Sequence, residues 1–347
     1  MTSTPTAQRR GPLDHAPIVP MVLSWPGSRA FIAVLALFLV SPLIAPGSIG
    51  PTAIVSMLPF AALMAIVAIG QTLVIQQGGL DLSIPGAVTL GALIVARFGA
   101  EDALGLPVAI LVAVVGTALF GLLSGLVITL FALPPLVVTI AMNALMVGTV
   151  QALSGGFAGQ SPEALSQFAL GRWFGIPVLV YFAVALVVLT HVVVKMTRAG
   201  RRFELVGENP RSAANIGIGT RGYTIAAYVL SSALAAVGGI LLAGLLRNPT
   251  LTAGDDYLLP SIAAVVLGGT ALTGGRGSIV GTALGALFLA QLSQLVQTFT
   301  QATAVQNIVQ ALIIGVGIVA QLQLGGTTSR IRGLVRGRTG AGTPAPE

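Results

Sequence analysis

Apolar segments recur along most of the chain, and this repetition constrains the fold more than any other feature. The segments are 30–46, 53–76, 84–98, 106–130, 134–153, 176–196, 221–246, 257–272, 278–299 and 304–324. A helix crosses the hydrocarbon core of a bilayer in about 20 residues, so most of these segments are long enough to span it. Two of them, 84–98 and 257–272, are short and lie beside glycine pairs. We expect eight to ten crossings, with ten preferred, in an all-α bundle of transmembrane helices.

The composition excludes an ordinary soluble fold. Hydrophobic residues make up 55% of the chain and charged residues 8%, whereas about a quarter of the residues of a soluble domain are charged. The chain has 44 glycines, and small residues let helices approach closely in lipid. Gly121-x-x-x-Gly125 and Gly281-x-x-x-Gly285 are therefore predicted to be close helix contacts. The absence of cysteine excludes disulfides, Cys-ligated zinc and thiol catalysis.

The distribution of basic residues predicts the orientation in the membrane. With ten crossings and both termini in the cytoplasm, only Arg97, Arg172 and Arg247 lie outside. The basic residues on the inside are Arg9, Arg10, Arg29, Lys195, Arg198, Arg201, Arg202, Arg211, Arg221, Arg276, Arg330, Arg332, Arg336 and Arg338. This is a strong positive-inside bias. It accounts for the net charge of +7 without a nucleic-acid partner.

Polar segments at both ends of the chain frame a single transmembrane domain. Residues 1–29 are polar and proline-rich, and residues 325–347 are again polar. We expect both to be disordered cytoplasmic tails around a domain at 30–324. The first tail is too long for a signal peptide, and no small-residue cleavage site follows the first apolar run.

The longest internal loop, 197–220, contains a helix start. Asn209 can cap a helix, and Pro210 suits the first helical position. Gly217 and Gly219 are expected to end this short helix. The loop is predicted to be a docking element for a cytoplasmic partner, with an ordinary charged loop as the alternative.

Two glycine-rich segments echo one another about 190 residues apart. Gly78-Gly79-Leu80-Asp81-Leu82-Ser83 is similar to Gly268-Gly269-Thr270-Ala271-Leu272-Thr273. Internal repeats with short, glycine-interrupted segments point to transport pathways. In a chain so rich in glycine the echo also has a chance explanation.

The chemistry that a chain needs to use ATP by itself is missing. A P-loop requires a lysine after a glycine-rich turn, and the only lysine, Lys195, follows three valines. Asp81 is the one acid expected at membrane depth, where charges are costly and kept for function. It is a candidate for a pathway group, a proton relay or a residue that caps the helix at 84–98.

Uncharged polar residues suggest a pathway for a neutral, hydroxyl-rich solute. The candidate pathway or gate residues are Gln71, Thr72, Gln76, Gly78, Gly79, Asp81, Ser83, Thr139 and Asn143. The alternative for each polar side chain is a hydrogen bond between helices.

Four blocks of sequence resemble one known family. Residues 70–94, with Gly78-Gly79-Leu80-Asp81-Leu82-Ser83, are similar to the Gly-Gly-Ile-Asp-Leu-Ser signature of bacterial ribose-type (carbohydrate) ABC importer permeases. Residues 135–139 resemble the family's Pro-x-Phe-Ile-Val-Thr, and 200–218 resemble its cytoplasmic loop, although Glu208 replaces a glycine. Residues 263–287 resemble its Gly-Gly-Thr-Ser-Leu-x-Gly-Gly-Arg-Gly block. The resemblance covers about 30–325.

The resemblance implies a type II-like permease subunit without enzyme activity or a bound cofactor. ATP and magnesium would be held by a partner ATPase, a periplasmic binding protein would deliver the sugar, and a second copy or a sister permease would complete the pathway among the membrane lipids. The implied ATPase-coupling residues are Gly200, Arg201, Glu204, Gly207, Glu208, Asn209, Pro210, Ala213 and Ala214. The implied structural glycine motif is Gly268, Gly269, Gly274, Gly275, Arg276 and Gly277.

Two alternatives differ in solute or in energy source. Permeases of the same fold for branched-chain amino acids or nucleosides resemble Gly-Gly-Leu-Asn-Leu-Gly, whereas Asp81 and Ser83 follow the sugar pattern. An ion-coupled secondary transporter would need its own ion site, for which Asp81 is the candidate.

Overall fold

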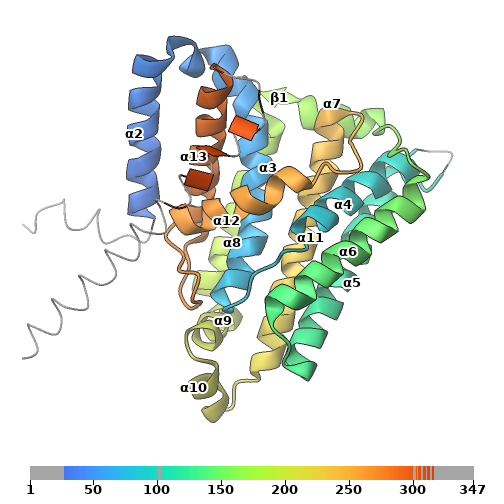
Figure 1. The fold of residues 1–347 in the computed structure, drawn as a ribbon, viewed down its shortest axis with the longest axis vertical. Coiled ribbons are helices and arrows are strands. Elements are labelled where there is room, and N and C mark those ends of the chain that lie inside the picture. The colour runs from blue at the N-terminus through green and yellow to red at the C-terminus, as the bar shows by residue number, and fades with distance from the viewer. Residues whose placement is uncertain are drawn as a thin grey trace, which may run out of the picture.

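The structure is a computed structural model that describes residues 27–100 and 103–299, with isolated positions between 302 and 315 (Figure 1). The tail predicted at 325–347, residues 1–26 of the other tail and most of the span predicted at 304–324 lie outside the described residues. The first helix begins at Ser28, two residues before the predicted start of the transmembrane domain at residue 30.

The described chain is a bundle of helices with one very short hairpin. The elements are α2 (Ser28–Ile44), η1 (Pro46–Ile49), α3 (Pro51–Gln76), α4 (Ile84–Phe98), α5 (Leu106–Phe131), α6 (Pro135–Ser154), α7 (Glu163–Leu170), β1 (Arg172–Trp173), β2 (Ile176–Pro177), α8 (Val178–Met196), α9 (Arg198–Glu208), α10 (Pro210–Asn215), α11 (Thr220–Leu246), η2 (Asp255–Tyr257), α12 (Leu258–Leu267) and α13 (Ile279–Gln297). Proline lies at the first or second position of α3, α4, α5, α6 and α10. There its missing N–H costs nothing and its fixed φ favours the helix.

The predicted apolar segments are helical, but the count of ten crossings is not confirmed. In the described part of the chain six helices are long and apolar enough to cross a membrane: α3, α5, α6, α8, α11 and α13. Helices α2, α4 and α12 have 17, 15 and 10 residues and are too short to count by length. The segment predicted at 257–272 differs most from the structure, because its helix α12 ends at Leu267, five residues before the predicted end, and a glycine-rich loop follows. The chain is a multi-pass membrane protein.

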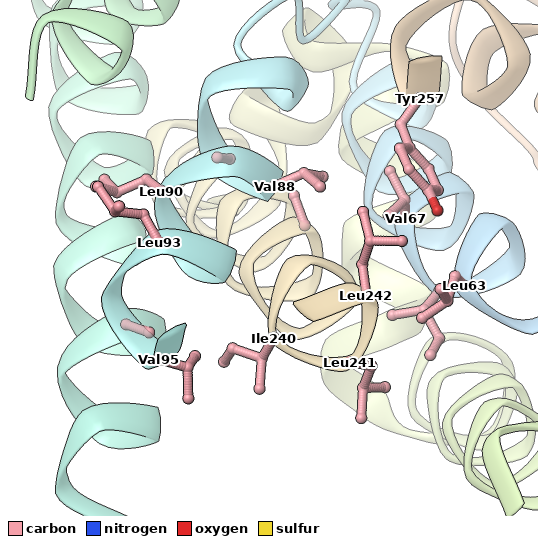
Figure 2. Close-up of a cluster of buried hydrophobic side chains, with 14 of the residues drawn as sticks. Leu63, Val67, Val88, Leu90, Leu93, Val95, Ile240, Leu241, Leu242 and Tyr257 are labelled. Carbon is pink, nitrogen blue, oxygen red and sulfur yellow. The ribbon is translucent and has the colours of Figure 1, made fainter. Parts of the chain in front are cut away.

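Helix α11 is the centre of the bundle and packs against α3, α4 and α5. Glycines allow this close approach: a Cβ at Gly91 of α4 would lie 2.6 Å from the carbonyl oxygen of Ala236, and one at Gly125 of α5 would lie 2.7 Å from Cα of Ile225. The predicted close contacts of the two Gly-x-x-x-Gly faces are thus confirmed, since Gly281 and Gly285 likewise meet the backbone of α12 and the loop after it. Apolar side chains of α3, α4 and α11 fill the layer between these helices (Figure 2).

The two ends of the bundle differ in structure and charge. Helices α9 and α10 project from one end, and α7 with the β1–β2 hairpin covers the other (Figure 1). Arg97, Arg172 and Arg247 lie at the α7 end, where the amide of Ser161 donates to the carbonyl of Arg247 at 2.7 Å. Helices α7 and α9 and the hairpin were not expected from the sequence, because they are short or too polar to give an apolar run.

Candidate functional site

Two glycine-rich loops begin with the same backbone motif. After α3, the Gly78 amide donates to the carbonyl of Ile75 and the Gly79 amide to that of Val74, at 2.9 and 3.1 Å. After α12, the Gly269 amide donates to Val266 and the Thr270 amide to Val265, at 2.9 and 3.2 Å. Both are Schellman caps, which need a left-handed residue, and Gly78 and Gly269 have φ of 76° and 89°. The caps pair Gly78 with Gly269, whereas the sequence echo pairs Gly78 with Gly268, so the two alignments differ by one residue. An internal duplication therefore stays a prediction.

The two loops meet each other and α9 at the carbonyl group of Gln76. The amide of Gly275 donates to this carbonyl at 2.9 Å. A Cβ at Gly274 would lie 3.0 Å from Cα of Gly78, and one at Gly207 of α9 would lie 3.0 Å from the carbonyl carbon of Gln76 and closer still to its oxygen. We call residues 76–79, 207–208 and 274–277 the loop junction.

Side chains strengthen the contact between α9 and the loops. The Gln77 amide donates through Nε2 to the carbonyl of Phe203 at 2.9 Å. The guanidinium of Arg276 lies 3.8 Å from the carboxylate of Glu208, although both side chains are more than half exposed. An exposed pair of this kind adds at most about 1 kcal/mol, so the backbone contacts define the junction.

Asp81 ties the first loop to the central helix. Its Oδ1 accepts from the Ser83 amide at 3.0 Å and from the Ser83 hydroxyl at 2.5 Å. Its Oδ2 accepts from the hydroxyl of Ser231 on α11 at 2.7 Å. The side chain is 1% exposed. Asp81 does not bind the first amides of α4, because Ser83 is the residue at the cap position, so the predicted capping role is corrected to that of a link between the loop and α11.

The other polar pathway candidates lie around these loops, with Thr72 and Thr139 buried and Asn143 partly exposed. Thr72 and Thr282 share a hydrogen bond of 2.8 Å. The Thr139 hydroxyl donates to the carbonyl of Pro135 within α6 at 3.0 Å and lies 3.4 Å from the carbonyl of Leu80 in the first loop, and Asn143 accepts from the amide of Gly86 at 2.8 Å. These contacts match the alternative interpretation, in which polar groups join helices.

Two buried glutamines differ from those candidates. Neither the oxygen nor the nitrogen of the Gln71 and Gln76 side-chain amides has a hydrogen-bond partner among the described residues. The Gln76 side chain lies against Gly277, where a Cβ would be 2.9 Å from its Cγ. Leaving a buried polar group unpaired costs about 1–3 kcal/mol, so these amides are suited to a state in which the neighbouring loops move.

Tyr228 of α11 belongs to this site and was missed by sequence reasoning. Its ring lies 3.3 Å from where a Cβ of Gly79 would be, and its buried hydroxyl has no partner among the described residues. A tyrosine within a largely apolar helix gives no sequence signal of such a contact.

Helix α9 is held to the bundle mainly by apolar side chains. Phe203 and Val206 are buried, and Phe203 packs edge-on against Tyr223 at 6.5 Å between ring centroids. Glu204 forms an ion pair with Lys195 at the end of α8. Glu204 is therefore engaged within the chain, while Arg201 and Arg202 are exposed.

The helix predicted after Asn209 is confirmed as α10. The side chain of Asn209 accepts from the amide of Ser212 at 3.0 Å. Of the two alanines that the resemblance implies for ATPase coupling, Ala213 is 3% exposed and faces the protein, whereas Ala214 faces outward. Ile216, just after the helix, is an apolar side chain that is 70% exposed.

Comparison with known proteins identifies the family. The profile of the family described as "Branched-chain amino acid transport system / permease component" matches residues 53–318. The chain belongs to this permease family. The ribose import permease of Bacillus subtilis (strain 168) is 30% identical to this chain over 295 residues, which cover 83% of this chain and 90% of that protein.

Two further relatives have other solutes in their names. The galactofuranose transporter permease of Escherichia coli (strain K12) is 32% identical over 318 residues, covering 86% of this chain and 91% of that protein. The autoinducer 2 import system permease protein of Escherichia coli (strain SMS-3-5) is 34% identical over 276 residues, covering 76% and 83%. No solved structure matches. The expected resemblance to ribose-type permeases is confirmed.

Proposed function

We propose that this chain is the transmembrane permease subunit of a bacterial ABC importer for a sugar or a sugar-like polyol. A periplasmic binding protein delivers the solute, and a separate cytoplasmic ATPase holds ATP and magnesium and drives transport. A second copy of the chain, or a sister permease, completes the pathway in the inner membrane. The names of the relatives, which include ribose and galactofuranose, support the solute class.

The loop junction is the observation that carries the proposal. Helix α10 projects from the bundle, and the adjoining α9 places Gly207 against the carbonyl of Gln76, which also accepts from Gly275 of the second loop. A force on α10 therefore reaches both glycine-rich loops through backbone contacts, with no flexible side chain between. Interactions of this kind transmit a displacement because a packed interface shifts between discrete arrangements.

Movement of the loops would open a gate at Asp81. The hydrogen bond between Asp81 and Ser231 joins the first loop to α11 across 150 residues of sequence. When it breaks, the amides of Gln71 and Gln76 and the hydroxyl of Tyr228 gain room for water or for solute hydroxyl groups. Both oxygens of Asp81 already accept hydrogen bonds within the chain, which does not favour an ion-coupled transporter.

The proposal includes ten crossings with both termini in the cytoplasm. Helix α4 begins at the loop inside the bundle and ends at the α7 end, and α12 stops before the second loop, so each works as a short helix inside the membrane (Figure 1). The basic residues near α8, α9 and α10 support a cytoplasmic position for that end.

Uptake in proteoliposomes tests the function. The permease is reconstituted with the ATPase and the binding protein encoded beside it, and a panel of labelled pentoses, hexoses, branched-chain amino acids and nucleosides is supplied. We expect uptake of a sugar that requires ATP and stops without hydrolysis. Uptake driven by an ion gradient alone, or restricted to amino acids, would show that the proposal is wrong.

Cysteine crosslinking tests the coupling element, because the chain has no cysteine of its own. Ala214→Cys and Ile216→Cys should crosslink to the ATPase. Leu111→Cys on α5, whose side chain is 62% exposed at the other end of the bundle, is the control that should not. Crosslinks from α10 to the binding protein would place this element outside the cell and contradict the topology.

A further inference from the structure

A groove of about 750 Å³ opens at the end of the bundle opposite α10. It runs between the first half of α3, the last turns of α11 and α13, and the segment from 250 to 260. It follows α3 from Ser56 to Met64, which is roughly 12 Å along the helix. None of its lining residues belongs to the loop junction or to the gate.

The polar groups of the lining gather at the mouth, and the floor is apolar. The polar groups at the mouth are the carboxylates of Asp255 and Asp256, the amide of Gln294 and the side chains of Ser56 and Thr252, and the exposed apolar side chains of Phe60 and Leu246 lie beside them. The floor is formed by buried side chains, namely Met57, Leu242, Tyr257 and Leu289. Among the described residues, none that lines the groove is basic. Apolar walls with a few polar groups and a volume of about 300–1,000 Å³ are typical of small-molecule sites.

Lipid is a poor occupant for this groove. Helices α3 and α13 are long enough to cross the membrane, yet Ser56, Gln294 and Gln297 all turn toward the groove. Polar groups that face hydrocarbon lose their hydrogen bonds with water, so they normally face protein or a water-filled cavity. The exposed apolar faces of α5 and α8 show the contrasting, lipid-suited surface.

We infer that this groove is an outer binding site for the transported solute, occupied before the gate at Asp81 opens. The inference rests on the proposed function. Carboxylate and amide groups at the mouth bind sugar hydroxyls, and the apolar floor packs against the carbon face of the ring. An uncharged solute fits better than an anion, because both ionisable groups at the mouth are acids.

Tyr257 strengthens the case for hydroxyl recognition. It lies in η2, outside the long membrane helices, and is buried beneath the mouth of the groove. Burial, together with the neighbouring carboxylate of Asp256, raises the pKa of the Tyr257 phenol. The phenol therefore remains a protonated hydrogen-bond donor at physiological pH, next to carboxylates that only accept.

Single cysteines test the site in the assembled importer. Ser56→Cys and Gln294→Cys lie in the groove, and Leu111→Cys is the matched control. Ser56 and Leu111 each lie five residues after the start of a helix at the same end of the bundle, and both are exposed. We expect a membrane-impermeant methanethiosulfonate reagent, added from outside, to modify both groove cysteines and to abolish uptake. The control cysteine should react only with a lipid-soluble maleimide.

The solute itself supplies the second readout. The sugar transported best in the panel described above, presented on its binding protein, should protect the groove cysteines from modification. Asp256→Asn should raise the half-saturating concentration about tenfold, as expected when a hydrogen bond to a charged group is lost, with ATP-driven transport still present at saturation.

Three results would overturn the inference. If the groove cysteines react with the maleimide alone, the groove faces lipid. A disulfide between two copies would make it a subunit contact, and modification without protection by the sugar would make it an aqueous vestibule only. In each case ATP-dependent sugar uptake by the unmodified protein would leave the proposed function standing, whereas its absence would remove the function and the inference together.

Discussion

Gly207 offers the sharpest test of the loop junction, because a single added methyl group reaches the backbone of another segment. In Gly207→Ala the Cβ would lie 3.0 Å from the carbonyl carbon of Gln76, closer to its oxygen, and 3.3 Å from Nε2 of Gln77. The Gln76 carbonyl cannot yield freely, because it also accepts from the amide of Gly275. Overpacking of this kind costs about 1–3 kcal/mol.

A matched variant removes the effect of helix propensity. Alanine is favoured over glycine inside a helix by about 1 kcal/mol, which partly offsets the clash. Gly222→Ala in α11 receives a comparable gain, since Gly222 is also helical and a Cβ there would meet nothing within 4 Å. The difference in unfolding free energy between the two variants therefore reports the packing cost, and we expect Gly207→Ala to be less stable than Gly222→Ala by about 1–3 kcal/mol.

The assay combines stability with coupling. Thermal unfolding of the purified complex gives the order of stability, and uptake with ATP hydrolysis in proteoliposomes gives the ratio of solute to ATP. Gly207→Ala should hydrolyse ATP with little uptake, whereas Gly222→Ala should match the unchanged protein in both. If Gly207→Ala is as stable and as well coupled as Gly222→Ala, then α9 does not bear on Gln76 and the path from α10 to the gate is wrong.

Three further predictions follow from the same geometry. Asp81→Asn should reduce uptake while the protein still inserts and assembles, because both oxygens of Asp81 accept hydrogen bonds and an asparagine amide has only one acceptor oxygen; Ser231→Ala should act in the same direction, and unchanged uptake in both variants would show that Asp81 has only a local structural role. Ala214→Trp should uncouple or release the ATPase without removing the permease from the membrane, since Ala214 faces outward, and normal ATPase binding on co-purification would exclude α10 as the docking element. Reporter fusions after residue 325 should be active in the cytoplasm and those in 155–175 in the periplasm, and the opposite pattern would refute the ten-span topology.

Most of the helices and part of the site could be predicted from the sequence. The segment predicted at 84–98 coincides with α4, and Asn209-Pro210 begins α10 as expected. These features depend on neighbouring residues, namely a run of apolar side chains or a cap followed by proline. The inward position of Ala213 was not predictable, because it depends on how α10 packs against α9.

The sequence by itself determined that the chain lies in a membrane, where its helices run and which family it belongs to, because the bilayer acts on each apolar segment separately. Only the tertiary structure decided which segments meet. Asp81 and Ser231 are 150 residues apart, and Gln76 meets both Gly207 and Gly275. Helices that are apolar on every side carry no periodic pattern to indicate their partners. The contacts instead depend on where small residues let two backbones approach, and that is a property of the packed bundle.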